Sequence, residues 1–195
     1  MLRSTRFAVI AMLVSLSAPA FASVIIAHTF EQLVDRTPIV IQGRVGQVDV
    51  RIDDSLGHIY TYAEILVDQT FKGRAPKILV VRQPGGEWSG RRETVAGAAR
   101  FTPGEGVILF IEPAADDPSL YVSVALAAGK VSLEKNARGQ WVGRRYLDGL
   151  SFVAPSKGNG GNAETVIPGP LVEQLGTLDD IVARIRQAVA KRGAP

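Results

Sequence analysis

Apolar and polar positions along most of this chain alternate with the period of a β-strand. From Ile39 to Val50 apolar residues recur at about every second position, which predicts a long first strand that can bend at Gly43 and Gly46. The run at 107–111 is apolar at every position, so we expect that strand to be central and buried. The remaining expected strands are 59–71, 77–82, a strand or pair within 121–134, and an edge hairpin arm at 140–145.

Two segments show helical spacing instead. Thr29 and Gln32 form a possible capping box for a short helix that ends before Pro38. The clearer helix follows Thr177, a natural N-cap, because apolar residues then recur at intervals of three and four. Together these elements predict a mainly β fold: a small five-stranded OB-like barrel with a short N-terminal helix and a C-terminal amphipathic helix. A β-sandwich is the alternative.

The N-terminal segment has the three parts of an export signal. Arg3 and Arg6 precede an apolar run at 7–16, and small residues follow as far as Ala22. The run is too short to cross a hydrocarbon core of roughly 30 Å. We therefore expect cleavage after Ala22 and export to the periplasm or the medium, with no membrane span in the mature chain. The expected organisation is a signal peptide at 1–22, a β-barrel domain at 23–155, a flexible connector at 156–176, and a helix at 177–195 that packs on the domain or is free.

Composition excludes several classes of function. The chain has no cysteine, which rules out disulfides, thiolate catalysis, cysteine-zinc sites and iron–sulfur clusters. Without the two arginines of the signal, 20 basic residues stand against 19 acidic ones. Such a balanced domain lacks the basic field that nucleic-acid binding needs, so we expect no nucleic-acid partner. No cofactor is predicted.

The best candidate for a ligand-binding site is the loop from Gly85 to Glu93. Long segments without regular structure are uncommon in compact domains and often bind ligands. Tryptophan and arginine are enriched among residues that dominate binding energy. The candidate residues are Glu87, Trp88, Arg91, Arg92 and Glu93. The alternative is that Trp88 folds back over one end of the barrel and the arginines are solvated.

A second aromatic and basic patch is formed by Trp141, Arg144, Arg145 and Tyr146. OB surfaces that hold oligosaccharides or single strands carry such residues. For an exported domain of balanced charge, saccharide or protein is the expected ligand. A half-buried edge strand would explain the same residues.

Neither a catalytic nor a metal site is predicted. The two histidines, His28 and His58, are not accompanied by a Gly-x-Ser-x-Gly elbow. Asp53, Asp54 and His58 share one turn, which offers too few ligands for a metal ion, and a turn favours aspartate for its own backbone reasons.

Part of the chain resembles a netrin-type module, the group that includes the tissue inhibitors of metalloproteinases. The residues that carry this resemblance are 29–34, 39–45, 59–61 and 71–73. The stretches 82–87, 101–105 and 107–110 more closely resemble uncharacterised exported bacterial proteins. Together these similarities cover roughly residues 29–133 and imply an OB-like barrel. The inhibitors place an N-terminal cysteine on the protease zinc, so this cysteine-free chain inherits no inhibitory residue from them.

The sequence therefore predicts an exported, non-enzymatic binding module whose ligand is a protein or an envelope saccharide. One alternative is a hydrolase with a carboxylate pair, either Glu87 with Glu93 or Asp53 with Asp54. The other is a structural envelope protein.

Overall fold

The computed structural model describes residues 23–26, 28–53, 57–154, 165–168 and 170–193. The predicted signal peptide, Asp54 and the connector residues 156–164 lie outside the described residues.

Five strands form a closed ring, which confirms the OB-like barrel. They are β2 (Ile39–Ile52), β3 (Ile59–Lys72), β4 (Ile78–Pro84), β7 (Gly106–Pro113) and β8 (Leu120–Ser123). The ring runs β2-β3-β4-β8-β7 and returns to β2, with β4 and β8 parallel and every other pair antiparallel. When only these five strands are counted along the chain, their order around the ring is first, second, third, fifth and fourth, which is the order of an OB fold.

Three more strands extend the sheet outward from β7. These are β9 (Lys130–Lys135), β10 (Trp141–Tyr146) and β13 (Val172–Thr177), in that order. A short 3₁₀ turn, η1 (Leu126–Gly129), joins β8 to β9. Two smaller sheets complete the β structure: the hairpin of β5 (Gly86–Trp88) and β6 (Arg91–Glu93), and the sheet of β1 (Ser23–Ile26), β11 (Leu150–Ala154) and β12 (Thr165–Pro168).

The two helices cover one face of this extended sheet. Helix α1 (Phe30–Arg36) begins at the predicted capping box, and α2 (Leu178–Gly193) follows β13 directly. Strand β7 is buried on both sides, as predicted. Val107, Leu109 and Ile111 point into the barrel core, whereas Ile108 and Phe110 join a second core beneath the helices. Helix α2 is therefore packed on the domain.

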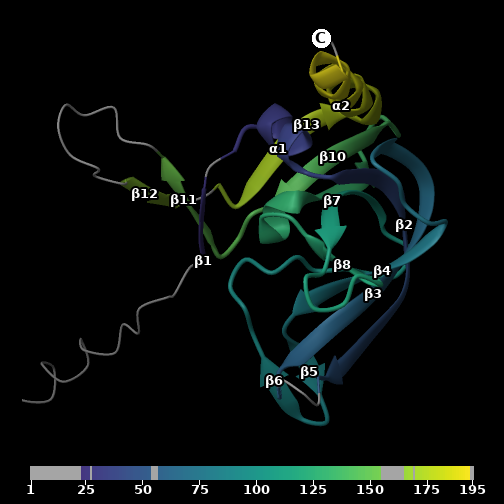
Figure 1. Ribbon diagram of the computed structural model, residues 1–195. Coiled ribbons are helices and arrows are strands. Elements are labelled where there is room, and N and C mark those ends of the chain that lie inside the picture. Colours follow the sequence, from purple (N-terminus) through teal and green to yellow (C-terminus); the bar gives the residue numbers. More distant parts are fainter. Residues whose placement is uncertain (1–22, 27, 54–56, 155–164, 169, 194–195) are drawn as a thin grey trace, which may run out of the picture.

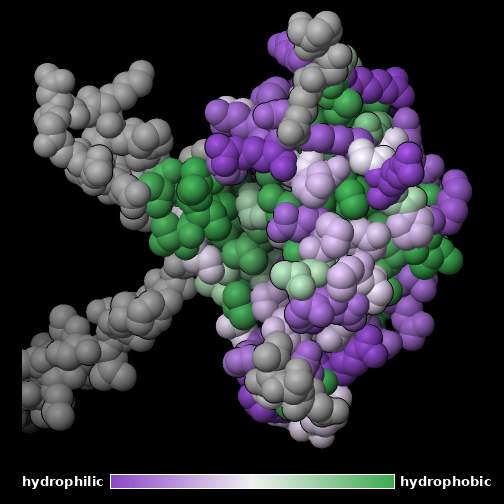
Figure 2. Space-filling model, viewed as in Figure 1, coloured by the Kyte–Doolittle hydropathy of each residue, from purple (hydrophilic) through white to green (hydrophobic). Residues whose placement is uncertain are grey.

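The β5–β6 hairpin lies away from the helices. Figure 1 shows α1 and α2 at one end of the molecule and the β5–β6 hairpin at the other. The β1–β11–β12 sheet projects to one side, and Figure 2 shows hydrophobic side chains gathered where β1 and β11 lie. Val24 and Ile26 of β1 are among its exposed apolar residues.

Three sequence predictions need correction. The loop from Gly85 to Glu93, predicted to lack regular structure, contains the β5–β6 hairpin. The edge arm at 140–145 is instead the interior strand β10, because β13 pairs with its far side. Residues 165–168 and 172–176 of the predicted connector belong to strands β12 and β13. The hairpin is a local pairing that the glycine-rich composition of the loop conceals, whereas β12 and β13 are placed by pairing with β11 and β10, which local composition does not report.

Candidate functional site

Two glycines seat the β5–β6 hairpin against the barrel. Gly85 and Gly86 have positive φ angles of 93° and 145°. A Cβ atom on Gly86 would lie 2.6 Å from Val50 Cγ1 and 3.0 Å from Thr61 Oγ1. The Thr61 hydroxyl donates a hydrogen bond to the Gly85 carbonyl (2.7 Å). Only glycine permits both this backbone conformation and this close approach.

Glu93 fastens the hairpin to the start of β3. Its Oε2 accepts a hydrogen bond from the backbone N–H of Ile59 (2.9 Å), and His58 Nδ1 lies 2.8 Å from its Oε1. These contacts, with the Ile59 N–H foremost, lower the pKa of Glu93 below its usual range. Arg91 adds a hydrogen bond to the Gly57 carbonyl at 3.2 Å. Two of the predicted site residues, Arg91 and Glu93, therefore have a structural role.

The other predicted residues of the loop remain on the surface. Trp88 does not cover the barrel end and stays 42% exposed. Glu87 accepts two hydrogen bonds from the Arg92 guanidinium, at 3.0 Å from Nε and 2.5 Å from Nη2, in an exposed pair. Because cross-strand partners share a face, Glu87 and Arg92 lie on one face of the hairpin, and Trp88, Arg91 and Glu93 on the other.

A groove of about 610 Å³ lies beside this hairpin. The segment 94–101 supplies many of its lining residues, and the barrel strands contribute Val48, Val50 and Thr61. Its charged residues are Glu87, Arg92, Glu93, Arg100 and Asp148. Each of these residues has a partner. Glu87 pairs with Arg92, Arg100 pairs with Asp148 at 3.8 Å, and Glu93 contacts His58. The groove lining is thus more apolar than polar, and its charged groups are paired.

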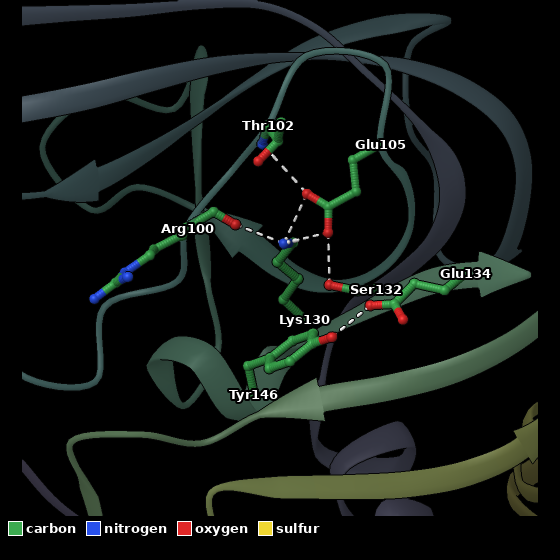
Figure 3. A network of polar contacts seen from close by, with 7 residues as sticks. All are labelled: Arg100, Thr102, Glu105, Lys130, Ser132, Glu134 and Tyr146. Atoms are coloured by element: carbon green, nitrogen blue, oxygen red, sulfur yellow. Dashed lines mark hydrogen bonds and ion pairs between the residues drawn. The ribbon is translucent and has the colours of Figure 1, made fainter.

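A smaller cavity of about 230 Å³ adjoins the groove. The two hollows share Asp148 and the segment 98–100 in their linings. Figure 3 shows the polar network in the lining of this cavity, where the side chains of Lys130, Glu105 and Ser132 meet. These three residues come from β9 and from the segment that precedes β7.

The Lys130 ammonium is the centre of this network. It is buried and donates hydrogen bonds to the Arg100 carbonyl (2.5 Å) and to both carboxylate oxygens of Glu105 (2.7 and 2.9 Å). Ser132 Oγ (2.6 Å) and the Thr102 N–H (3.2 Å) also donate to Glu105. Burial lowers the pKa of Lys130, and the Glu105 carboxylate opposes that shift. The network pins the segment 100–105 onto β9.

The structure divides the second predicted patch between the two faces of β10. Tyr146 donates a hydrogen bond to Glu134 Oε1 (2.5 Å), which raises the pKa of Tyr146, and Arg144 pairs with the same carboxylate. Arg145 is buried and pairs with Glu173. Trp141 is exposed beside Lys135. Of the four predicted residues, only Tyr146 lines the cavity.

Sequence reasoning missed the Lys130 network. Lys130, Ser132 and Glu134 alternate with apolar residues along β9, a pattern that places all three on one face. This signal was available in the sequence. Their partner Glu105, however, is 25 residues from Lys130, and no local pattern joins the two.

The other predicted groups lie apart from this cavity. Glu87 and Glu93 are on opposite faces of the hairpin, each beside its own partner. His28 is partly buried, and burial with the nearby Arg36 lowers its pKa. Asp54, one member of the other carboxylate pair, lies outside the described residues.

Comparisons with known proteins add no family. No protein-family model matches the sequence, and no curated protein is significantly similar to it. Within the part of the chain that the structure describes, no helix is long and apolar enough to cross a membrane.

Proposed function

We propose that this protein is an exported, non-enzymatic binding module that holds an extended ligand, a protein segment or an envelope saccharide, beside the β5–β6 hairpin. The observation that carries the proposal is the groove of about 610 Å³ between this hairpin and the segment 94–101. Ligand pockets of drug size measure about 300–1,000 Å³, so the groove has room for a specific ligand.

The way in which the hairpin is attached supports the proposal. Gly86 and Glu93 fix its base on β2 and β3, while Trp88, Arg91 and Arg92 stay exposed. Aromatic and arginine side chains are enriched at binding surfaces, and a backbone that is already fixed loses little conformational freedom when a partner docks. Export agrees with the N-terminal pattern of basic, apolar and small residues.

Affinity enrichment with a groove-blocking variant tests the proposal. The protein is immobilised and exposed to the envelope and secreted fractions of its own organism. Thr94→Trp adds bulk at an exposed position in the groove lining. The triple variant Trp88→Ala/Arg91→Ala/Arg92→Ala removes the exposed aromatic and arginine side chains of the hairpin. Arg138→Trp, exposed in the β9–β10 turn and outside the groove lining, is the matched control.

We expect a protein or a glycan that wild type and the Arg138→Trp control retain and that both site variants release. Retention by all variants would show that the ligand binds elsewhere. Turnover of a retained glycan or peptide would contradict the non-enzymatic assignment.

A further inference from the structure

The cavity beside the groove has an unusual balance of charge. Three ion pairs border it or contact its lining: Lys130 with Glu105, Arg100 with Asp148, and Arg144 with Glu134. Each pair joins one cation to one anion, so the cavity presents strong donors and acceptors without a net charge. An ionic ligand would meet a cancelling field, whereas neutral hydroxyl groups, which both donate and accept, match such pairs.

An aromatic side chain completes the cavity. Tyr146 lies in its lining with 40% of its surface exposed, and its hydroxyl is held by Glu134. Figure 3 shows the Tyr146 ring alongside Lys130, with its hydroxyl directed toward Glu134. Because this hydrogen bond fixes the ring, Tyr146 offers an apolar surface of constant orientation next to the polar groups. A pyranose ring combines hydroxyl groups with an apolar ring face, so it would match both the polar groups and the Tyr146 ring.

The size of the cavity limits the ligand further. At about 230 Å³ it is smaller than the pockets that hold drug-sized molecules, about 300–1,000 Å³. It therefore suits a single ring. The groove that shares residues 98–100 and Asp148 with it leads away toward the hairpin, where further units of a chain can lie.

We propose that the extended ligand is a neutral oligosaccharide, with one sugar ring held in this cavity against Tyr146. This inference rests on the proposed function, since it names the class of ligand that the groove holds. A peptide anchored by large apolar side chains fits less well, because alanines and paired polar groups make up the cavity lining apart from Tyr146.

The strand that carries Tyr146 also supplies a matched control. Trp141 lies on the same strand with similar exposure, 46% against 40% for Tyr146. The register of β10 with β9 places positions 141 and 144 on opposite faces, and 146 shares the face of 144. Trp141→Ala thus removes an exposed aromatic ring from β10 without altering the cavity.

Titration calorimetry with the full chain tests the proposal. The neutral probes are cellohexaose, maltohexaose and chitohexaose, and the charged probe is hexagalacturonate. We expect at least one neutral probe to bind and the charged probe to bind at least about tenfold more weakly. Tyr146→Ala should weaken neutral binding by about tenfold, Tyr146→Phe by less than about threefold because the ring remains, and Trp141→Ala by less than about twofold.

Chemical-shift mapping on the wild-type chain keeps the test independent of variant folding. Neutral probe should shift the amide signals of Ala99 and Ser132, which line the cavity. The inference is overturned if every neutral probe fails to bind, if hexagalacturonate binds best, or if Tyr146→Ala and Trp141→Ala have equal effects. Loss of binding with Thr94→Trp but not with Tyr146→Ala would overturn the cavity assignment while leaving the groove proposal intact.

Discussion

Replacing Lys130 by methionine is expected to destabilise the protein by about 3 kcal/mol. The substitution leaves Glu105 with only Ser132 and the Thr102 N–H as donors and removes the partner of the Arg100 carbonyl. Breaking a buried ion pair by removing one member costs roughly 3–5 kcal/mol. The lower end applies because the Glu105 side chain is 17% exposed and keeps two hydrogen bonds.

Urea and thermal unfolding measure this effect. For a domain of this size 1 kcal/mol corresponds to roughly 2–4 °C in Tm, so Lys130→Met should unfold about 6–12 °C below wild type. The double variant Lys130→Met/Glu105→Gln should be more stable than the single variant, because glutamine carries no buried charge. A loss below about 1 kcal/mol in Lys130→Met, or strictly additive effects in the double variant, would refute a stabilising role for the pair.

The pH dependence gives an independent check of the same group. Burial lowers the pKa of Lys130, so the folded protein releases this proton at a lower pH than the unfolded chain does. Between the folded pKa and the unfolded value of about 10.4, the unfolded chain binds more protons, and stability from this group rises with pH. The difference in unfolding free energy between wild type and Lys130→Met should therefore widen as pH rises toward 10.4. A constant difference would contradict burial of the ammonium.

Three further predictions concern the fold and the hairpin. Gly43→Ala would press a Cβ atom against the backbone carbonyl oxygen of Leu66 in β3, so urea unfolding should show a loss of about 1–3 kcal/mol; an unchanged midpoint would refute the close approach. Thr177→Ala removes the cap of α2 and should cost about 1 kcal/mol in thermal unfolding, whereas Thr94→Ala, exposed and outside any helix, should not. Glu93→Gln should speed hydrogen exchange in the β5–β6 hairpin. Because the Ile59 N–H lowers the pKa of Glu93, wild type should lose the same protection as pH falls below about 4.3, and equal protection at pH 3 and 7 would count against the clamp.

Local signals in the sequence were sufficient for much of the fold. The capping box at Thr29, the cap at Thr177 and the apolar stripe of α2 all act within one or two helical turns, and both helices form as predicted. Strand β2 follows from the alternation at 39–50, and β3 matches the strand expected at 59–71 to within one residue. Their pairing shifts register after Gln42 and Val45, beside the glycines expected to bend the first strand. Each of these signals is carried by neighbouring residues, which is why sequence alone reveals it.

Long-range pairing explains what could not be predicted. Strand β13 is placed by β10, from which 25 residues separate it, and the partner of β1 is β11, more than 100 residues away. The candidate patch on β10 illustrates the same limit for a site. Arg145 and Tyr146 are adjacent in sequence, yet one is buried against Glu173 and the other borders the cavity. Only the register of β10 between its neighbours decides which face each side chain takes.

The Lys130 network joins the stability of the domain to the shape of the proposed binding site. Through the Arg100 carbonyl and Glu105 it holds the segment 100–105, and Arg100 lines both the cavity and the groove. An apolar pair in place of Lys130 and Glu105 would suit a domain that needed only stability, since such replacements are often neutral or stabilising. The buried pair instead ties this segment to β9, because Lys130 donates hydrogen bonds to the Arg100 carbonyl and to both carboxylate oxygens of Glu105. The same residue pair therefore holds the segment 100–105, which contains no helix or strand, in place beside the proposed site.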